Sequence, residues 1–468
     1  MHREKAMVWG LMLAVGILHC AMLVYDLFHP DVFFHADRAL QRFPHMMGYL
    51  EVLQRGQGVA DFLARHGNIG DYWVHAMIFR GVGQYGILVV QILLQIGSVY
   101  SVLCIARMAG AGRLVAVGAA GAYAILPHSL ILPHTLTSEA LFIPGLIFST
   151  HALFKFVESG QFRFAVLSGA LVGVATLIRP LTLLWPLAVA PVLLLAMPRG
   201  VSKVLGYLLI SYVPVALWMG FIWTQIGQFS MGPSDHQMGN NMWQRVWRIA
   251  ETLPATERDA IVVKYLQGGR PGSVELRRYA GSIDVVNYAR FVGEYPLPAL
   301  KHTTRDAAVF VGKSGVERIF LDYLATSDDD KKVRRDIQKT WRGRWERDGM
   351  ANTLLYLVKT DPWLVFAAVI GSVVFTTLVI LAIATACVTL VRTLRAGKLV
   401  SSDAVIIILA GLPLYTFLVS QGLAAPESRH RAPAEFALCV LAALAVQSLD
   451  RRRQIIVGRR AAVHGGTL

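Results

Sequence analysis

Hydrophobic residues are gathered into ten long runs, most of them close to the roughly 20 residues that a helix needs to cross a bilayer. We predict that each run is a membrane-spanning helix. The ranges are Met7–Phe28, Gly86–Ala106, Leu114–Leu132, Ala140–Phe156, Phe164–Ile178, Leu181–Met197, Val204–Ile226, Leu364–Val391, Ala404–Ala424 and Ala434–Leu449. The fifth and sixth runs are short and meet at Arg179-Pro180, so a single broken hairpin is the alternative there.

Two long segments lie between the apolar runs. His29–Tyr85 has the pattern of amphipathic helices lying on the bilayer surface, for example at Met46–Leu53 and Ala60–His66. Gly227–Pro362 is long enough to form a small, mainly helical domain. In the second segment, we expect helices near Met242–Thr252, Val285–Val292 and Lys331–Arg347. The predicted fold class is an all-α polytopic membrane protein. Its three parts are an N-terminal membrane module (1–226), an extracytoplasmic domain (227–362) and a C-terminal membrane module with a basic tail (363–468).

The composition agrees with this class. Hydrophobic residues make up 55% of the chain and charged residues 16%, with a mean hydropathy of +0.50, whereas soluble domains carry about 25% charged residues. The net charge of +15 comes from residues that flank apolar runs, so we expect membrane lipids as partners and no nucleic acid. All four cysteines fall in apolar runs, which predicts unpaired thiols in the core.

The basic residues predict the orientation. With the N-terminus in the cytoplasm, sixteen Lys and Arg residues lie in or beside the cytoplasmic connections, and only Arg179, Arg429 and Arg431 lie in the short outer ones. Both termini are then cytoplasmic. The first run could be a signal peptide, but it lacks a small-x-small cleavage site, so we interpret it as a retained span.

Charged residues are nearly absent from the centres of the runs. Gln91, Gln95 and His151 are the polar exceptions, and interhelical hydrogen bonds explain them. Charges gather instead at the expected outer ends, at Asp26, Asp37, Arg38, Glu139, Arg179, Glu427, Arg429, Arg431 and Glu435. This favours chemistry at the outer surface over transport through the membrane. Phosphate-binding loops, nucleotide fingerprints and metal-type spacings are missing from the sequence, so we expect no cofactor and no metal site.

Asp37 follows the first span and has the chemistry of a general base for an incoming hydroxyl group. The alternative is a surface carboxylate paired with Arg38 or Arg42. Asp31 is a competing acid in the same loop, although Pro30 before it indicates a turn.

Glu139 and Arg179 are expected to form a pair. An arginine between two apolar runs is costly unless it is paired or solvated, and Glu139 is its natural partner. The alternative for Glu139 is a role in the first turn of the fourth span, complementing the helix dipole behind a capping Thr137 or Ser138.

Arg429, His430 and Arg431 form a cationic cluster just before the last span. Such donors suit a phosphate or pyrophosphate group. The alternative is snorkelling to lipid headgroups. The positive-inside bias runs against arginines at this place, which favours the anion site.

The order of these motifs resembles the C-type-fold (GT-C) integral-membrane glycosyltransferases, in the branch related to protein O-mannosyltransferases and lipid A aminoarabinose transferases. Four motifs carry the resemblance: the outer-loop acid Asp37, the run Pro133 to Phe142, the run Ala175 to Pro180, and the run Glu427 to Pro433. The stretch Gly239-Asn240-Asn241 is similar to a Gly/Asn-rich segment of those enzymes.

The resemblance implies transfer of a sugar, with inversion, from a polyprenyl-phosphate carrier to an extracytoplasmic glycan, lipid or protein acceptor. It implies Asp37 as the base and Arg429 with Arg431 at the departing phosphate. The other implied substrate-binding residues are Arg38, Glu139, Arg179, Asn240, Asn241 and His430. The family often has an Asp-Glu pair where this chain has Asp37-Arg38.

Two alternatives remain open at this point. An O-antigen ligase or polymerase also has many spans and a large outer loop, and would place its essential groups, such as Arg290 or Arg305, in that loop. A lipid-linked sugar flippase or transporter is the alternative that is not an enzyme. Topology and family analogy together indicate a bacterial inner membrane, and an endoplasmic reticulum membrane is the alternative that the sequence alone leaves open.

Overall fold

The structure is a computed structural model, and it describes residues 2–28, 47–48, 51–52, 55, 69–227, 229, 231, 234–266, 283–312, 359, 362–420 and 431–465. Every regular element in these ranges is helical. The elements are α1 (His2–Phe28), α5 (Ile69–Met108), α6 (Arg113–Ala124), α7 (Pro127–Ile131), η1 (Leu132–His134), α8 (Ser138–Ser159), α9 (Phe162–Ile178), η2 (Pro180–Thr182), α10 (Trp185–Ala196), α11 (Val201–Ile226), α12 (Ser234–Ala250), α13 (Ala255–Tyr265), α14 (Val285–Glu294), α15 (Pro296–Gly312), α18 (Pro362–Ala396), α19 (Ser401–Ser420), η4 (Ala432–Ala434) and α20 (Glu435–Gly465).

All ten predicted apolar runs coincide with helices, but they are not all simple spans. Within the part of the chain that the structure describes, seven helices are long and apolar enough to cross a membrane. The third run is a pair, α6 and α7 with η1, bent by 65°, which gives an eighth span if the pair is counted as one. The fifth and sixth runs become α9 and α10, which are shorter than a typical span: at 1.5 Å per residue they reach about 26 Å and 18 Å.

Proline fixes the bend in the third run. Leu126 is extended because it precedes Pro127, which starts α7 at the N1 position. The same effect ends α9, since Arg179 is extended ahead of Pro180. Each break turns the chain where polar side chains are found, at His128 in one case and at Arg179 in the other.

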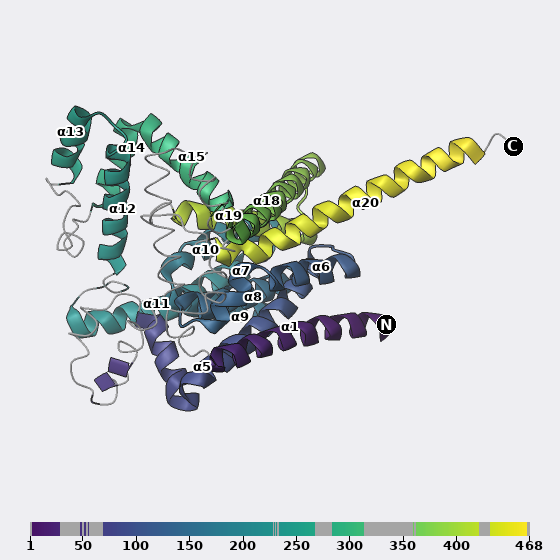
Figure 1. Cartoon of the computed structure of the whole chain (residues 1–468), viewed down its shortest axis with the longest axis horizontal. Helices are drawn as coiled ribbons and strands as arrows, with labels where there is room; N and C mark the ends of the chain where they lie inside the picture. The colour runs from purple at the N-terminus through teal and green to yellow at the C-terminus, as the bar shows by residue number, and fades with distance from the viewer. Residues whose placement is uncertain are drawn as a thin grey trace.

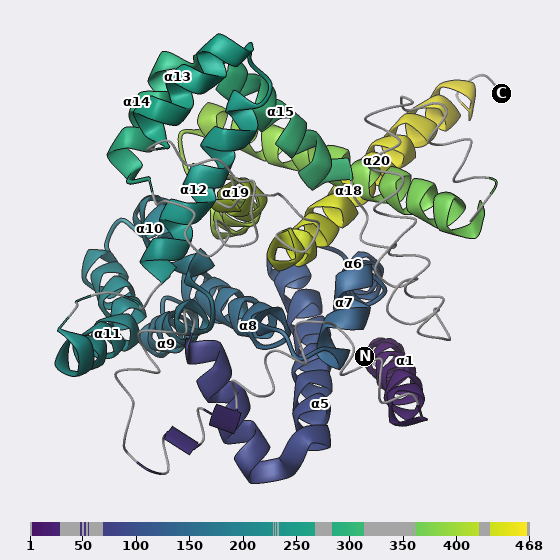
Figure 2. The same ribbon diagram turned by 60° about the vertical axis from the view of Figure 1, so that its left-hand side comes forward.

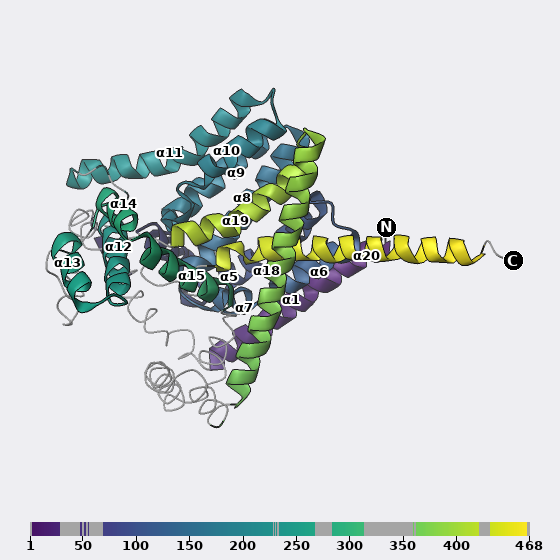
Figure 3. The same ribbon diagram turned by 90° about the horizontal axis from the view of Figure 1, so that it is seen from above.

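Small residues let the central helices pack closely. A Cβ atom added to Gly173 of α9 would lie 2.7 Å from the carbonyl oxygen of Ser211 in α11, and one added to Gly169 would lie 2.9 Å from that of Tyr207. Such Gly-x-x-x-Gly spacing is typical of helix pairs in membranes. Figure 3 shows α8, α9, α10 and α11 next to one another, and the contacts between neighbouring helices agree.

The sequence predicts surface helices for residues up to Tyr85, but α5 begins at Ile69 and includes the second predicted span. Its first residues continue into the span through a kink at Gly83, whose φ of 72° favours glycine. Gln91, in the span, contacts His75 on the other side of the kink, with 3.1 Å between their Nε2 atoms. The predicted helices at Met46–Leu53 and Ala60–His66 fall largely or wholly outside the described residues.

Helices α12 to α15 form a group with a hydrophobic cluster of its own, including Trp243, Ile249, Ile261 and Phe291. Figure 1 shows α12, α13 and α14 on the side of the molecule opposite the two chain ends. In the turned view of Figure 2, α15 leads from this group back toward the bundle. Two of the three helices expected between residues 227 and 362 are present as α12 and α14, and Lys331–Arg347 lies outside the described residues.

The four cysteines are free thiols, all within helices, as predicted. Their expected place in the core is wrong for two of them. Cys20 and Cys387 are exposed on the surface of the bundle, and only Cys439 is fully buried. The reason is that α1 and α18 bury little of their apolar surface inside the protein and leave the rest for lipid.

Candidate functional site

We call the end of the bundle at which α8 and α20 begin the polar end, and the opposite end, at which α8 finishes, the basic end. Glu139, in the first turn of α8, forms an ion pair with Arg179, which lies between α9 and η2. The carboxylate side chain is 5% exposed and the guanidinium side chain 16%. The pairing predicted from the sequence is therefore present. Thr137 is the N-cap residue of α8 but makes no side-chain capping bond, and the Ser138 hydroxyl donates to Glu139 Oε2 at 3.1 Å.

A second buried carboxylate, Glu435, lies at the start of α20. Its Oε1 atom is 2.8 Å from Nδ1 of His128 and 3.3 Å from Nε of Arg431. All three side chains are at most 2% exposed. One oxygen thus contacts two partners, one from α7 and one from the turn before η4.

Arg431 also contacts two other helices. Its Nη1 group donates to the carbonyl oxygen of Phe310 in α15, and its guanidinium carbon lies 3.4 Å from the centre of the Phe375 ring in α18. The side chain is fully buried, which excludes the snorkelling alternative for this residue. Arg431 therefore joins the α12–α15 group to the last spans.

A third buried set links the first span to η1. His134 Nδ1 lies 2.5 Å from Oδ2 of Asp26, and His134 Nε2 lies 3.0 Å from Nδ1 of His19. The three side chains are 0 to 2% exposed. Asp26 and His19 are in the C-terminal half of α1, so this chain of contacts fixes that helix against the polar end.

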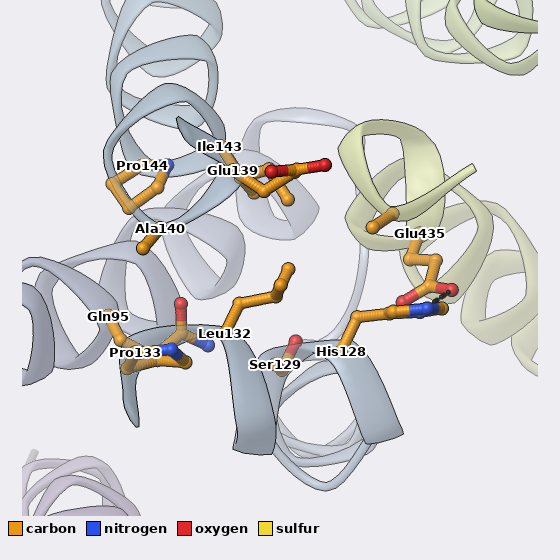
Figure 4. Close-up of a pocket in the computed structure, with 11 residues that line it drawn as sticks. Gln95, His128, Ser129, Leu132, Pro133, Glu139, Ala140, Ile143, Pro144 and Glu435 are labelled. Carbon is orange, nitrogen blue, oxygen red and sulfur yellow. Dashed lines mark hydrogen bonds and ion pairs between the residues drawn. The ribbon is translucent and has the colours of Figure 1, made fainter. Parts of the chain in front are cut away.

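The polar end also contains a small pocket with a cavity volume of about 10 Å³, roughly the space of one water molecule. Figure 4 shows Glu139 and Glu435 facing it from α8 and α20, with His128 and Ser129 on α7 below them. Gln95 of α5 completes the polar lining. Its Oε1 accepts from the Tyr123 hydroxyl at 3.5 Å, and His151 contacts Ser101 at 3.3 Å, so the interhelical hydrogen bonds expected for these two residues are present.

Several predicted site residues cannot be placed in this arrangement. Asp37, Arg38, Arg429 and His430 lie outside the described residues. Asn240 and Asn241 fall in α12, but the orientation of their side chains is not described. The structure therefore brings together Glu139, Arg179 and Arg431 of the predicted set, at one end of the bundle.

The histidines were missed by the sequence analysis. His19, His128 and His134 each contact a buried partner at the polar end, yet none was a candidate. The available signal was the pair of Pro-His dipeptides, Pro127-His128 and Pro133-His134, within one apolar run. Among the described residues, no group of three His, Cys, Asp or Glu side chains could hold a metal ion.

Comparison with known proteins bears on the same helices. Residues 72–223 match the model of the family described as dolichyl-phosphate-mannose-protein mannosyltransferase, and this range includes Glu139 and Arg179. No curated protein matches the chain. Among solved structures, the apo crystal structure of the Archaeoglobus fulgidus oligosaccharyltransferase matches with a TM-score of 0.40 and 12% sequence identity. The match covers 84% of this chain but 44% of that protein, so the chain spans less than half of its length.

The family match confirms the resemblance predicted from the sequence for this stretch of helices. Together with the apolar helices, it makes the chain an integral membrane protein. Residues 72–223 are thus similar to a family of membrane glycosyltransferases described as dolichyl-phosphate-mannose-protein mannosyltransferases.

Proposed function

We propose that this protein transfers a sugar, with inversion, from a polyprenyl-phosphate carrier to an acceptor in the cell envelope, on the extracytoplasmic face of a bacterial inner membrane. The observation that carries the proposal is the ion pair of the buried Glu139 with the partly buried Arg179, at the polar end and within residues 72–223. Buried charges are expensive to maintain in a membrane bundle and mark functional sites there. The acceptor is a glycan, a lipid or a protein.

The reaction needs two kinds of group. A base takes the proton from the acceptor hydroxyl while its oxygen bonds to the anomeric carbon, and the bond from that carbon to the phosphate oxygen breaks. Cations then stabilise the negative charge on the departing polyprenyl phosphate. We propose Asp37 as the base, and Arg429 with Arg431 at the phosphate, in keeping with the resemblance.

Arg431 is engaged by protein groups in this structure. The Phe310 carbonyl is a neutral acceptor for the guanidinium, whereas a phosphate would offer it anionic oxygens and a bidentate geometry. We propose that the donor phosphate replaces the Phe310 carbonyl oxygen as the acceptor for Arg431, while Arg431 Nε still donates to Glu435. Arg38, His430, Asn240 and Asn241 complete the proposed substrate-binding set.

The proposed domain arrangement follows from the same scheme. Residues 1–226 and 363–468 would hold the lipid donor between them, and residues 227–362 would cover the site and receive the acceptor. Both termini would be cytoplasmic. Support comes from the position of α12 to α14 opposite the chain ends and from the Arg431 contacts that join α15 to α18 and α20.

The test uses sealed vesicles with the extracytoplasmic face outward, polyprenyl-phosphate-mannose as the donor probe and an envelope extract as the acceptor source. We expect Asp37→Asn to lower the rate of sugar transfer by at least about 100-fold, the scale of a lost general base. Asp31→Asn, which changes the other acid of the same loop, is the matched control and should transfer normally.

A different pattern would support an O-antigen ligase. If Arg290→Ala or Arg305→Ala abolished transfer while Asp37→Asn left it intact, the chemistry would lie in the long loop and the proposal would be wrong. If no variant changed transfer and a strain lacking the protein accumulated carrier lipid on the cytoplasmic face, a flippase would explain the data instead.

A further inference from the structure

The turn between α9 and α10, residues 179–184, begins with the arginine that pairs with Glu139. Arg179 is extended, η2 follows it, and α10 starts at Trp185. Backbone N–H and C=O groups at such helix ends have no helical partners and need other ones, above all in a membrane protein. The groups that bind this turn therefore decide how firmly Arg179 is held.

Two tyrosines from neighbouring spans bind the turn. The Tyr415 hydroxyl group, on α19, donates to the carbonyl oxygen of Leu181 at 2.7 Å and accepts from the backbone N–H group of Leu184 at 3.2 Å. The Tyr212 hydroxyl group, on α11, donates to the carbonyl oxygen of Leu183 at 2.8 Å. A hydroxyl group has a single proton to donate, so each tyrosine spends it on this turn.

Side-chain contacts hold the same turn on both sides. The hydroxyl oxygens of Thr176, in the last turn of α9, and Thr182, in η2, lie 2.9 Å apart, and both residues are buried. On the other side, the ring of Trp185 lies 5.2 Å from the ring of Tyr415, measured between centres. The turn thus has a defined conformation, and Tyr415 ties it to α19.

This link joins the two membrane modules beside the buried charges. Helix α19 packs against α10 (Figure 3) and comes shortly before Arg431 in the sequence. Glu139, the partner of Arg179, lines the same small pocket as Glu435, the partner of Arg431. Tyr415 therefore connects the turn that carries one arginine to the module that carries the other.

We propose that Tyr415, assisted by Tyr212, is a positioning residue for Arg179. The Tyr415 hydroxyl group fixes the turn, so that the Arg179 guanidinium meets the lipid donor at a set place relative to Arg431. The inference rests on the proposed function, in which both arginines bind substrate. Misplacing a binding group by about 1 Å can lower a rate by about 100-fold. A hydroxyl group that never touches the donor can thus affect its use.

The test is a titration of polyprenyl-phosphate-mannose in the vesicle assay of sugar transfer, with the full-length protein. Tyr415→Phe keeps the ring beside Trp185 and removes only the hydroxyl group. We expect the KM for the donor to rise by about threefold to tenfold, the scale of one hydrogen bond, and Arg179→Lys to raise it at least as much. Loss of folded protein would lower the maximal rate and leave KM unchanged. The exposed Tyr100, on α5, supplies the matched control Tyr100→Phe, which should change neither.

Combining Tyr415→Phe with Arg179→Lys separates positioning from a general structural role. If the hydroxyl group acts through Arg179, the double variant should have the KM of Arg179→Lys alone, because both changes remove the same interaction. Independent effects would multiply. Tyr212→Phe removes one bond from the same turn, so it should raise KM by a smaller factor and add nothing to Arg179→Lys. It carries the test if Tyr415→Phe does not fold.

The outcomes are distinct. An unchanged KM in Tyr415→Phe, or in Tyr212→Phe where Tyr415→Phe does not fold, would overturn the positioning role and leave the proposed function standing. Multiplied effects in the double variant would do the same. Absence of donor-dependent transfer by the unmodified protein would instead overturn the proposed function, and the positioning role with it.

Discussion

The two ends of α8 differ in whether their charged side chains are buried or exposed. Glu139, at the start of the helix, is buried and paired with Arg179, whereas Lys155 and Glu158, in the last two turns, are exposed. The same contrast runs through the bundle. Glu435 is buried where α20 begins, while Arg107, Arg163, Lys203 and Arg451 are exposed at the basic end.

The difference separates two roles of charge. Exposed basic residues beside a bilayer set orientation and meet lipid headgroups, at little energetic cost. Buried charges lose their hydration and persist only with partners of good geometry, so a cluster of them indicates function more strongly than it indicates stability. Substitutions at the two ends should therefore have very different effects.

The largest effect is expected for Glu139→Gln, which leaves Arg179 without its ionised partner. Removing one member of a buried pair costs about 3 to 5 kcal/mol, so the apparent melting temperature should fall and sugar transfer should be lost. Glu158→Gln, in the same helix but exposed, is the matched control and should change neither. Equal effects of the two substitutions would contradict the contrast between the ends.

A smaller effect is expected for Asp26→Asn, which weakens the chain from Asp26 through His134 to His19. The loss of one buried charge-assisted bond should cost about 1.5 to 3 kcal/mol. Because α1 is followed in the sequence by Asp37, the proposed base, we expect the rate of sugar transfer to fall. The fall should be larger than the loss of folded protein alone explains. Thermal unfolding and donor turnover measure the two, and Lys5→Ala, exposed in the same helix, is the control.

The ion pair of Arg392 with Asp403 sharpens the comparison, because it lies at the basic end. Asp403 is 3% exposed there, but its partner Arg392 is 61% exposed and therefore hydrated. Because Asp403 is buried, we expect Arg392→Ala to cost about 1 to 3 kcal/mol and to leave transfer unchanged. Thermal unfolding compared with Arg395→Ala, also exposed in the last turn of α18, checks this. If Arg392→Ala lowered the stability as much as Glu139→Gln does, the cost of losing a charged partner would not depend on which end of the bundle it lies at.

The smallest effect is expected for Lys203→Ala. Its ammonium group donates to the carbonyl oxygen of Gly160 at 2.7 Å, but the contact is exposed to solvent. Stability should change by less than about 0.5 kcal/mol, and donor binding should not change. The checks are thermal unfolding and the binding of polyprenyl-phosphate-mannose to the protein in lipid nanodiscs. A loss of donor binding would place part of the site at the basic end.

The sequence predicted the parts that depend on local pattern. Runs of apolar residues located the membrane helices, and the cost of an unpaired Arg179 between two of them predicted its pairing with Glu139. Arg431 was predicted to lie at a functional cluster, but its burial against Phe310 and Phe375 was not, because those residues are 121 and 56 positions away in the chain.

The histidine contacts could not be predicted for the same reason. His128 meets Glu435 across 307 positions of the sequence, and His134 meets Asp26 across 108. A lone histidine in an apolar run gives no indication of its partner. The bend at Pro127 decides which way His128 points, and its consequence depends on how α20 packs beside α7 and α8.

The central claim is that the buried charges of the polar end belong to a sugar-transfer site. Mass spectrometry of envelope glycans and glycolipids tests it most directly, in cells lacking the protein and in the same cells producing the unmodified protein, Glu139→Gln or Glu158→Gln at equal levels. We predict that one glycan or glycolipid loses a sugar residue without the protein, and that the unmodified protein and Glu158→Gln restore it while Glu139→Gln does not. An unchanged set of glycans in cells lacking the protein, or full restoration by Glu139→Gln, would contradict the claim.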